Sequence, residues 1–139
     1  MGQVVGFGNI SSGRRAFLWD ATNGMIDLGF TLSSDEESVA NDVNNNGLVV
    51  GTLFGNQGSF IWQQGIGMTN LNDLLDPSAA GWDLQTAAAI NDAGQIVGWG
   101  INPDGFSRAY LLTPNTVPEP TGLVWLSLVS AALLLKRRR

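Results

Sequence analysis

Short apolar runs separated by turn-forming residues dominate residues 1–114. Residues 48–51 (LVVG) and 59–62 (SFIW) are two such runs, and Gly, Asn and Asp cluster on either side of them. Short apolar runs bounded by turn residues are typical of buried β-strands. The 18 glycines and the charged fraction of only 14% fit a chain with many tight turns. The pattern therefore predicts an all-β fold for this part of the chain, without long soluble helices.

The chain also repeats itself. GQVVG at residues 2–6 recurs as GLVVG at 47–51 and as GQIVG at 94–98, with offsets of 45 and 47 residues. Downstream, AFLW at 16–19 matches SFIW at 59–62 and, more loosely, AYLL at 109–112. We therefore expect about three repeats of about 45 residues. We expect the first repeat to be truncated, because only Met1 precedes Gly2, whereas the second repeat has a strand candidate at residues 39–43 before Gly47.

Each complete repeat offers four strand candidates, which in the second repeat are residues 39–43, 48–51, 59–62 and 68–71. Four strands in about 45 residues is the size of one propeller blade. We therefore predict a partial β-propeller-like array of about three 45-residue repeats. A β-solenoid is the alternative, although its coils are usually shorter.

The C-terminal segment has a different character. Residues 121–135 (TGLVWLSLVSAALLL) carry no charge and are followed by Lys136, Arg137, Arg138 and Arg139. As a helix this run is about 22 Å long, against a hydrocarbon core of about 30 Å. Lys136 and Arg137 extend the span by directing their charges outward. We predict one C-terminal transmembrane helix with the basic cluster as a cytoplasmic stop-transfer signal; the alternative is a buried core helix.

Composition narrows the chemistry. The chain has no cysteine and no histidine, which excludes disulfides, Cys/His zinc sites and any triad with a histidine base. Residues 1–114 hold 11 acidic and 3 basic side chains, so they lack the basic stripe that binds phosphate backbones. We predict no nucleic-acid partner, no catalytic or metal-binding residues, and no cofactor.

The C-terminal segment supports a family resemblance. Val117, Pro118, Glu119 and Pro120, then the apolar run, then the terminal KRRR closely resemble the PEP-CTERM sorting signal of Gram-negative bacteria that make exopolysaccharide. A tail of this kind is also called an ice-binding protein C-terminal domain. The resemblance implies an inner-membrane single-pass precursor with its repeats outside. An exosortase-type membrane protease processes such precursors, which then reach the cell surface or are secreted.

The repeats resemble HAF repeats of bacterial extracellular proteins, named for a His-Ala-Phe run. The corresponding positions here hold Arg15-Ala16-Phe17, Gly58-Ser59-Phe60 and Arg108-Ala109-Tyr110, so the histidine is absent from all three. No common activity accompanies this repeat. We divide the chain into repeats (1–114), a PEP linker (115–120) and a helix with its basic tail (121–139), and expect it to be a fragment of a longer protein.

These features predict a non-enzymatic surface or matrix protein whose repeats have a structural or binding role, with exopolysaccharide as a candidate partner. Two alternatives remain open: an extracellular polysaccharide-acting enzyme and a calcium-stabilised adhesin. The enzyme would use carboxylates of the acidic run Asp35-Glu36-Glu37, for which a solvated loop is the simpler interpretation.

The adhesin would use residues 42–47 (DVNNNG), which partly match a calcium loop through Asp42, Asn44 and Asn46. The twelfth loop position is Leu53 rather than Glu, so we favour a hairpin turn in which Asn46 and Gly47 adopt positive φ values.

Among the tryptophans, Trp19 and Trp62 follow the repeat and are expected in the core. Trp82 and Trp99 lie outside it and are the candidate carbohydrate contacts.

Overall fold

The fold, seen in a computed structural model that describes residues 2–34, 36–115 and 128–132, is all-β, as predicted. The described residues form three antiparallel sheets, none of them closed. The first sheet contains β1 (Val4–Ile10), β2 (Gly13–Asp20) and β3 (Gly24–Asp27). The second contains β4 (Ser38–Val43), β5 (Val49–Leu53), β6 (Gly58–Gln63) and β7 (Gly67–Asn70). The third contains β8 (Asp83–Ile90), β9 (Ile96–Ile101), β10 (Ser107–Pro114) and β11 (Leu128–Ala132).

Strand order within each sheet follows the chain, so each sheet is a simple meander. All four strands predicted in the second repeat are confirmed to within one or two residues. The first sheet has three strands, and β1 occupies the position of β5 and β9. Within the described residues, no strand pairs with the edge of β1 where β4 pairs with β5 and β8 pairs with β9. Two short 3₁₀ helices, Leu71–Leu74 and Pro77–Ala79, connect β7 to β8.

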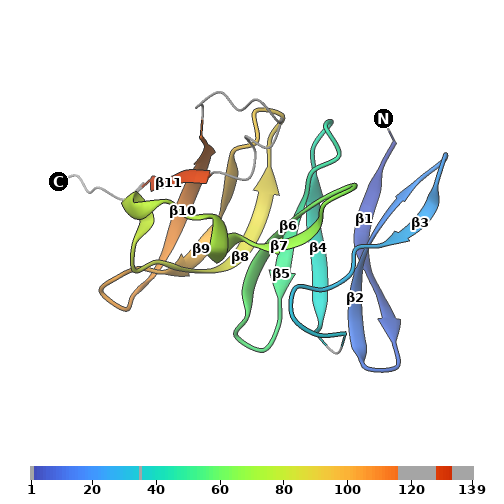
Figure 1. Cartoon of the computed structure of the whole chain (residues 1–139), viewed down its shortest axis with the longest axis horizontal. Helices are drawn as coiled ribbons and strands as arrows, with labels where there is room; N and C mark the ends of the chain where they lie inside the picture. Colours follow the sequence, from blue (N-terminus) through green and yellow to red (C-terminus); the bar gives the residue numbers. More distant parts are fainter. Residues whose placement is uncertain (1, 35, 116–127, 133–139) are drawn as a thin grey trace.

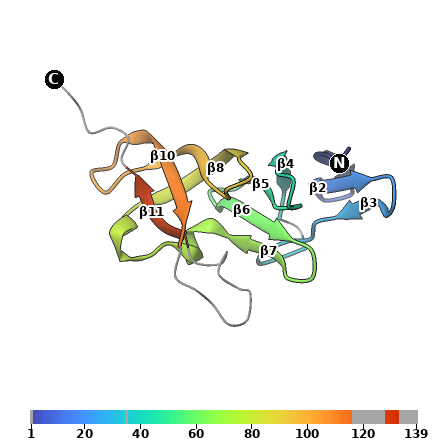
Figure 2. The same cartoon turned by 90° about the horizontal axis from the view of Figure 1, so that it is seen from above.

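The three sheets stand in a row along the long axis of the molecule, with the first sheet at one end and the third at the other (Figures 1 and 2). One apolar cluster joins the first and second sheets and includes Leu18, Val49 and Phe60. A second cluster joins the second and third sheets and includes Val50 and Tyr110. The second sheet is therefore buried on both faces, and five of the six residues of β6 are buried.

Three turns between strands share one design, which differs from the two-residue turn predicted at Asn46-Gly47. Asn44 accepts a backbone hydrogen bond from Gly47 and donates one to Leu48, so the turn spans residues 44–47. Gly47 has a φ of 78°, but Asn46 is not in the positive-φ region, which corrects the expectation that both adopt positive φ. The same pattern recurs from Asn91 to Gly94 and from Asn102 to Gly105. In each turn the first asparagine side chain accepts a backbone N–H four residues later, which selects asparagine there.

Five residues of the predicted membrane helix are described, and they form strand β11 rather than a helical turn. Leu111 pairs with Ala132 and Leu112 with Ala131. In the second sheet the equivalent residue Ile61 pairs with Thr69, so β11 occupies in the third sheet the place that β7 occupies in the second. A uniformly apolar run has no periodicity that separates strand from helix, which is why the sequence did not indicate this pairing.

The rest of the predicted helix and basic tail, residues 121–127 and 133–139, lies outside the described residues. Across residues 2–34, 36–115 and 128–132, none of the helices is long and apolar enough to span a membrane.

Candidate binding surfaces

The proposed calcium ligands link the second and third sheets in this structure. Both Asp42 carboxylate oxygens accept backbone hydrogen bonds, Oδ1 from Val43 at 2.9 Å and Oδ2 from Ile90 at 2.8 Å. Asn44 uses Oδ1 for its own turn and donates from Nδ2 to the carbonyl oxygen of Asn91 at 3.0 Å. The Asp42 and Asn44 oxygens are thus used in folding rather than pointed at a common ion.

The turn beside this contact adds a further link. Asn45 donates to both carboxylate oxygens of Asp92, from its backbone at 2.8 Å and from its side chain at 2.7 Å. These hydrogen bonds hold the pKa of Asp92 below its usual range. Asn46 donates from Nδ2 to the carbonyl oxygen of Asp92. We call the contacts that Asp42, Asn44, Asn45 and Asn46 make with residues 90–92 the polar junction.

Two residues of the acidic run, Glu36 and Glu37, are described, and both accept hydrogen bonds within the fold; Asp35 lies outside the described residues. Glu36 is buried, and its two oxygens accept hydrogen bonds from the backbone and the hydroxyl of Thr31. Glu37 accepts hydrogen bonds from the backbone N–H and the Nε of Arg14, each at 3.0 Å, which lower its pKa. The expected solvated loop is therefore wrong for Glu36, because closing this loop requires an acceptor inside it.

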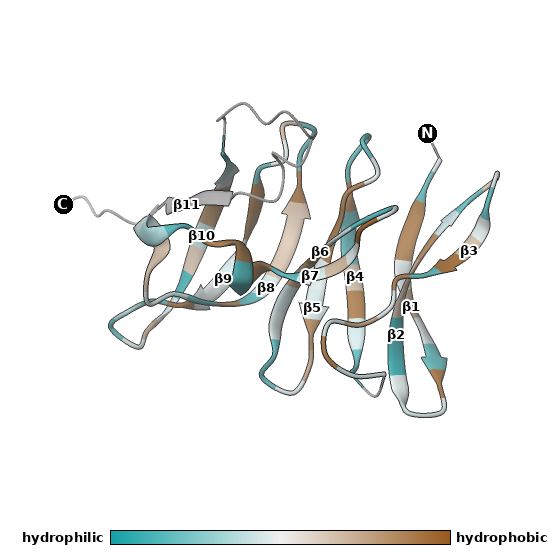
Figure 3. Ribbon diagram, viewed as in Figure 1, coloured by the Kyte–Doolittle hydropathy of each residue, from teal (hydrophilic) through white to brown (hydrophobic). Residues whose placement is uncertain are grey.

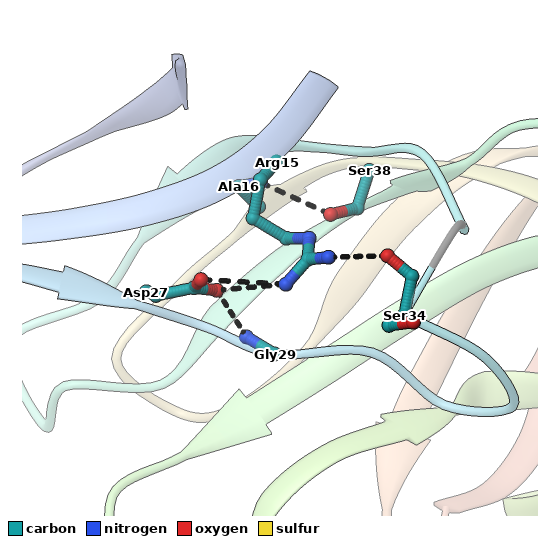
Figure 4. A network of polar contacts seen from close by, with 6 residues as sticks. All are labelled: Arg15, Ala16, Asp27, Gly29, Ser34 and Ser38. Carbon is teal, nitrogen blue, oxygen red and sulfur yellow. Dashed lines mark hydrogen bonds and ion pairs between the residues drawn. The ribbon is translucent and has the colours of Figure 1, made fainter. Parts of the chain in front are cut away.

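Arg15 stands where HAF repeats have histidine, and its contacts hold the first sheet to the following loop (Figure 4). Its guanidinium lies 3.3 Å from Asp27 and donates to the carbonyl oxygen of Ser34 at 2.6 Å. The ring of Phe30 lies 5.6 Å from the same guanidinium. Asp27 also accepts a hydrogen bond from the backbone N–H of Gly29. Its carboxylate balances the charge of Arg15 through the ion pair.

The outer face of the first sheet exposes several apolar side chains. Trp19 is 39% exposed, which corrects its expected place in the core, whereas its equivalent Trp62 is buried as predicted. Val4 and Met25 are also exposed on this face. A pocket of about 330 Å³ opens between Gly8, Phe17, Met25 and Asp27. In the second sheet the equivalent face is covered by the first, and nothing among the described residues covers Trp19 in that way.

The outer face of the third sheet contains one of the two predicted carbohydrate contacts. Trp99 on β9 is 45% exposed, and Val97, two residues earlier on the same face, is 44% exposed. A pocket of about 200 Å³ is lined by residues that include Val97, Asn91, Gln95 and Leu111. Trp82 is half-buried against the cluster between the second and third sheets. The structure therefore does not bring Trp82 and Trp99 together as one aromatic platform.

Two other predictions concern residues that the structure does not describe. The sorting motif at Val117, Pro118, Glu119 and Pro120 lies outside the described residues, as do Lys136, Arg137, Arg138 and Arg139. Among the residues that are described, no group of three or more acidic side chains is arranged to hold a metal ion.

The sequence missed the exposure of Trp19 because it depends on whether a neighbouring sheet covers that face, and it missed the Gly8 pocket because that depends on the strand beside β1. The available signal was the missing counterpart of residues 39–43 in the first repeat, which leaves one edge of that sheet open. Comparison with family models, with curated proteins and with solved structures finds no match to this chain.

Proposed function

We propose that this chain is an exported cell-surface or matrix protein whose residues 117–139 act as a PEP-CTERM-type sorting signal. The observation that carries the proposal is the order of three parts: the VPEP motif, 15 uncharged residues and a terminal KRRR. Four consecutive cations after an apolar run stop translocation and remain on the cytoplasmic side. The repeats then face outward, and an exosortase-type protease processes the precursor at the PEP motif.

The prolines give the motif its physical role. Pro118 and Pro120 fix their own φ angles and disfavour helix in the residue before each of them. The membrane helix is thereby kept from extending into the motif, and an extended backbone is presented to the protease. In the bilayer, residues 128–132 would be part of the helix, so the proposal requires them to leave the edge of β10.

Fractionation of cells tests the sorting proposal. The gene is fused to a signal peptide and expressed in a Gram-negative host that has an exosortase. Changing Lys136 through Arg139 to Ser is expected to release the precursor from the inner membrane, because each cation resists transfer by about 2.5 to 3.5 kcal/mol. Changing Pro118 and Pro120 to Ala is expected to preserve anchoring and reduce processing. Normal anchoring and processing of both variants would refute the proposal.

For the body, we propose a propeller-like array in which each sheet is one blade and the repeats have a structural or binding role. Sequential strand order in every sheet and apolar packing between consecutive sheets support this arrangement. The carboxylates of Asp42, Glu36 and Glu37 all accept structural hydrogen bonds, which favours this role over the calcium and enzyme alternatives.

We propose exopolysaccharide as the ligand of the outer face of the third sheet. Trp99 is exposed there, and an exposed indole presents a flat apolar surface on which a sugar ring can stack. Titration of the purified protein with host exopolysaccharide is expected to show binding that Trp99→Leu weakens. Trp19→Leu, at the other end of the row, is the matched control. Equal loss in both variants, or in neither, would reject Trp99 as the contact.

A further inference from the structure

The opening strand of a sheet has a defined partner in the second and third sheets. β4 pairs with β5 and β8 pairs with β9, in both cases antiparallel, with one register shift in β4 and two in β8. β1 is the first-sheet equivalent of β5 and β9, because GQVVG aligns with GLVVG and GQIVG. Its other edge pairs with β2 as β5 pairs with β6. The edge of β1 that faces away from β2 is therefore where an opening strand belongs.

Two glycines of β1 match glycines that need an opening strand to explain them. Gly6 and Gly8 align with Gly98 and Gly100 of β9. A Cβ at Gly98 would overlap the carbonyl oxygen of Thr86, and one at Gly100 would lie 2.5 Å from that of Asp83. Both oxygens belong to β8, so the close approach of that strand excludes any side chain there.

The same positions in β1 have open space. A Cβ at Gly6 would meet only the Phe17 ring, at 3.3 Å, and one at Gly8 would meet no atom within 4 Å. Neither glycine has a positive φ that would require glycine for conformational reasons. Within the described chain, Gly6 and Gly8 thus provide room for a backbone that no segment supplies.

Apolar residues of β1 are exposed at this end of the row. Val4 is 53% exposed, whereas its equivalents Val49 and Ile96 are both fully buried. Phe7 and Ile10 are also exposed, and Figure 3 shows the hydrophobic colouring of β1 at the end of the row. An unpaired apolar edge of this length is prone to pair with another strand.

We infer that the open edge of β1 binds one extended polypeptide segment with the sequence pattern of β8, namely the opening strand of a further repeat of this kind. The segment runs antiparallel to β1, in the register that β8 keeps with β9. Its equivalents of Leu84, Ala87 and Ile90 then lie opposite Gly8, Gly6 and Val4. This is strand addition, in which the main chain provides affinity and small side chains allow close approach. The inference rests on the repeats alone and not on the sorting tail.

A synthetic peptide with the sequence of residues 82–92, blocked at both ends and labelled, tests this inference by fluorescence anisotropy with the full chain. Saturable binding is expected. Gly8→Val is expected to weaken it by about tenfold or more, since the new side chain occupies the space of the incoming backbone. The free variant should keep its melting temperature, because no atom lies within 4 Å of the new Cβ. A peptide carrying Ala87→Pro, which lacks one strand N–H, is the matched negative ligand.

Hydrogen exchange of the wild-type protein provides a second readout that does not depend on any variant. The peptide is expected to slow exchange in β1 and to leave β9 unchanged. Protection of β9 instead would mean that the peptide exchanges with β8 of the same chain, and would overturn the inference. Absence of saturable binding, or equal binding to Gly8→Val, would overturn it as well. So would a dimer of the chain that pairs through β1 and is not displaced by the peptide, because the edge would then belong to a second copy.

Discussion

Removing one acceptor oxygen from the Asp42 side chain tests whether the polar junction holds the second and third sheets together. Asp42→Asn keeps the shape of the side chain but replaces one carboxylate oxygen with an NH₂ group. Because the two oxygens accept from two different backbone N–H groups, the amide can satisfy only one of them. In either orientation a donor faces a donor.

The expected loss follows from the bond between sheets. A hydrogen bond to a charged group contributes about 1.5 to 3 kcal/mol, and an unpaired buried donor costs about 1 to 3 kcal/mol. The local bond to Val43 joins adjacent residues and constrains little. We therefore assign most of the effect to Ile90 and expect Asp42→Asn to lower the free energy of unfolding by about 2 kcal/mol. Asp42→Ala, which removes both acceptors, is expected to cost about 2 to 4 kcal/mol.

Urea denaturation of the full chain measures this effect as a shift in midpoint at constant slope. Asp104→Asn in the exposed turn 102–105 is the matched control, since it removes the same charge without an acceptor between sheets. Amide exchange of Ile90 should accelerate in Asp42→Asn alone. A loss below about 0.5 kcal/mol, or an equal loss in the control, would refute the role of the junction, because ordinary surface changes produce effects of that size.

Three further predictions use other contacts. Gly98→Ala is expected to destabilise the chain by about 1 to 3 kcal/mol or more through overlap with Thr86, and Gly6→Ala by less than about 0.5 kcal/mol, as measured by urea midpoints. Tyr110→Phe is expected to cost about 1 kcal/mol in the same assay, because the hydroxyl donates to Thr86 at 2.8 Å and burial raises its pKa, so that it stays protonated. Arg14 lowers the pKa of Glu37, so this contact stabilises the fold above the carboxyl's unfolded pKa and is lost as the pH falls through the folded value. Acid titration of unfolding midpoints should therefore show a weaker pH dependence for Glu37→Gln than for wild type.

Much of the architecture could be predicted from the sequence because it repeats. Apolar runs and turn residues located the strands of the second repeat, and alignment carried them to the other repeats. The sequence also placed Trp62 in the core, because Leu112 replaces it in the third repeat and both are buried. Periodicity identifies which residues share a face, but not which face has a neighbour. Trp19 shares the pattern of Trp62 and is exposed because the first sheet stands at the end of the row.

Several contacts between repeats could not be predicted, since they join residues that differ between repeats. Asp42 accepts from Ile90, but the third-repeat equivalent of Asp42 is Ala89, which has no carboxylate. Asn45 donates to Asp92, its own equivalent one repeat later. In an alignment of the repeats, such substitutions look like ordinary variation within an exposed turn. Only the packing of consecutive sheets shows that the residue in one repeat and the residue in the next are partners in a single contact.

The tail shows how the proposed sorting role and the repeat fold depend on each other. β11 pairs with Leu111 and Leu112 in the register that β7 keeps with Ile61 and Trp62, so these five residues supply the third sheet with its fourth strand. A helix in the bilayer needs the same residues and satisfies their backbone groups internally. The two uses therefore exclude each other, and membrane insertion would open the edge of β10 on the outer side of the membrane. Under the proposed function, anchoring converts the complete third sheet into a three-stranded one with an edge available for another strand.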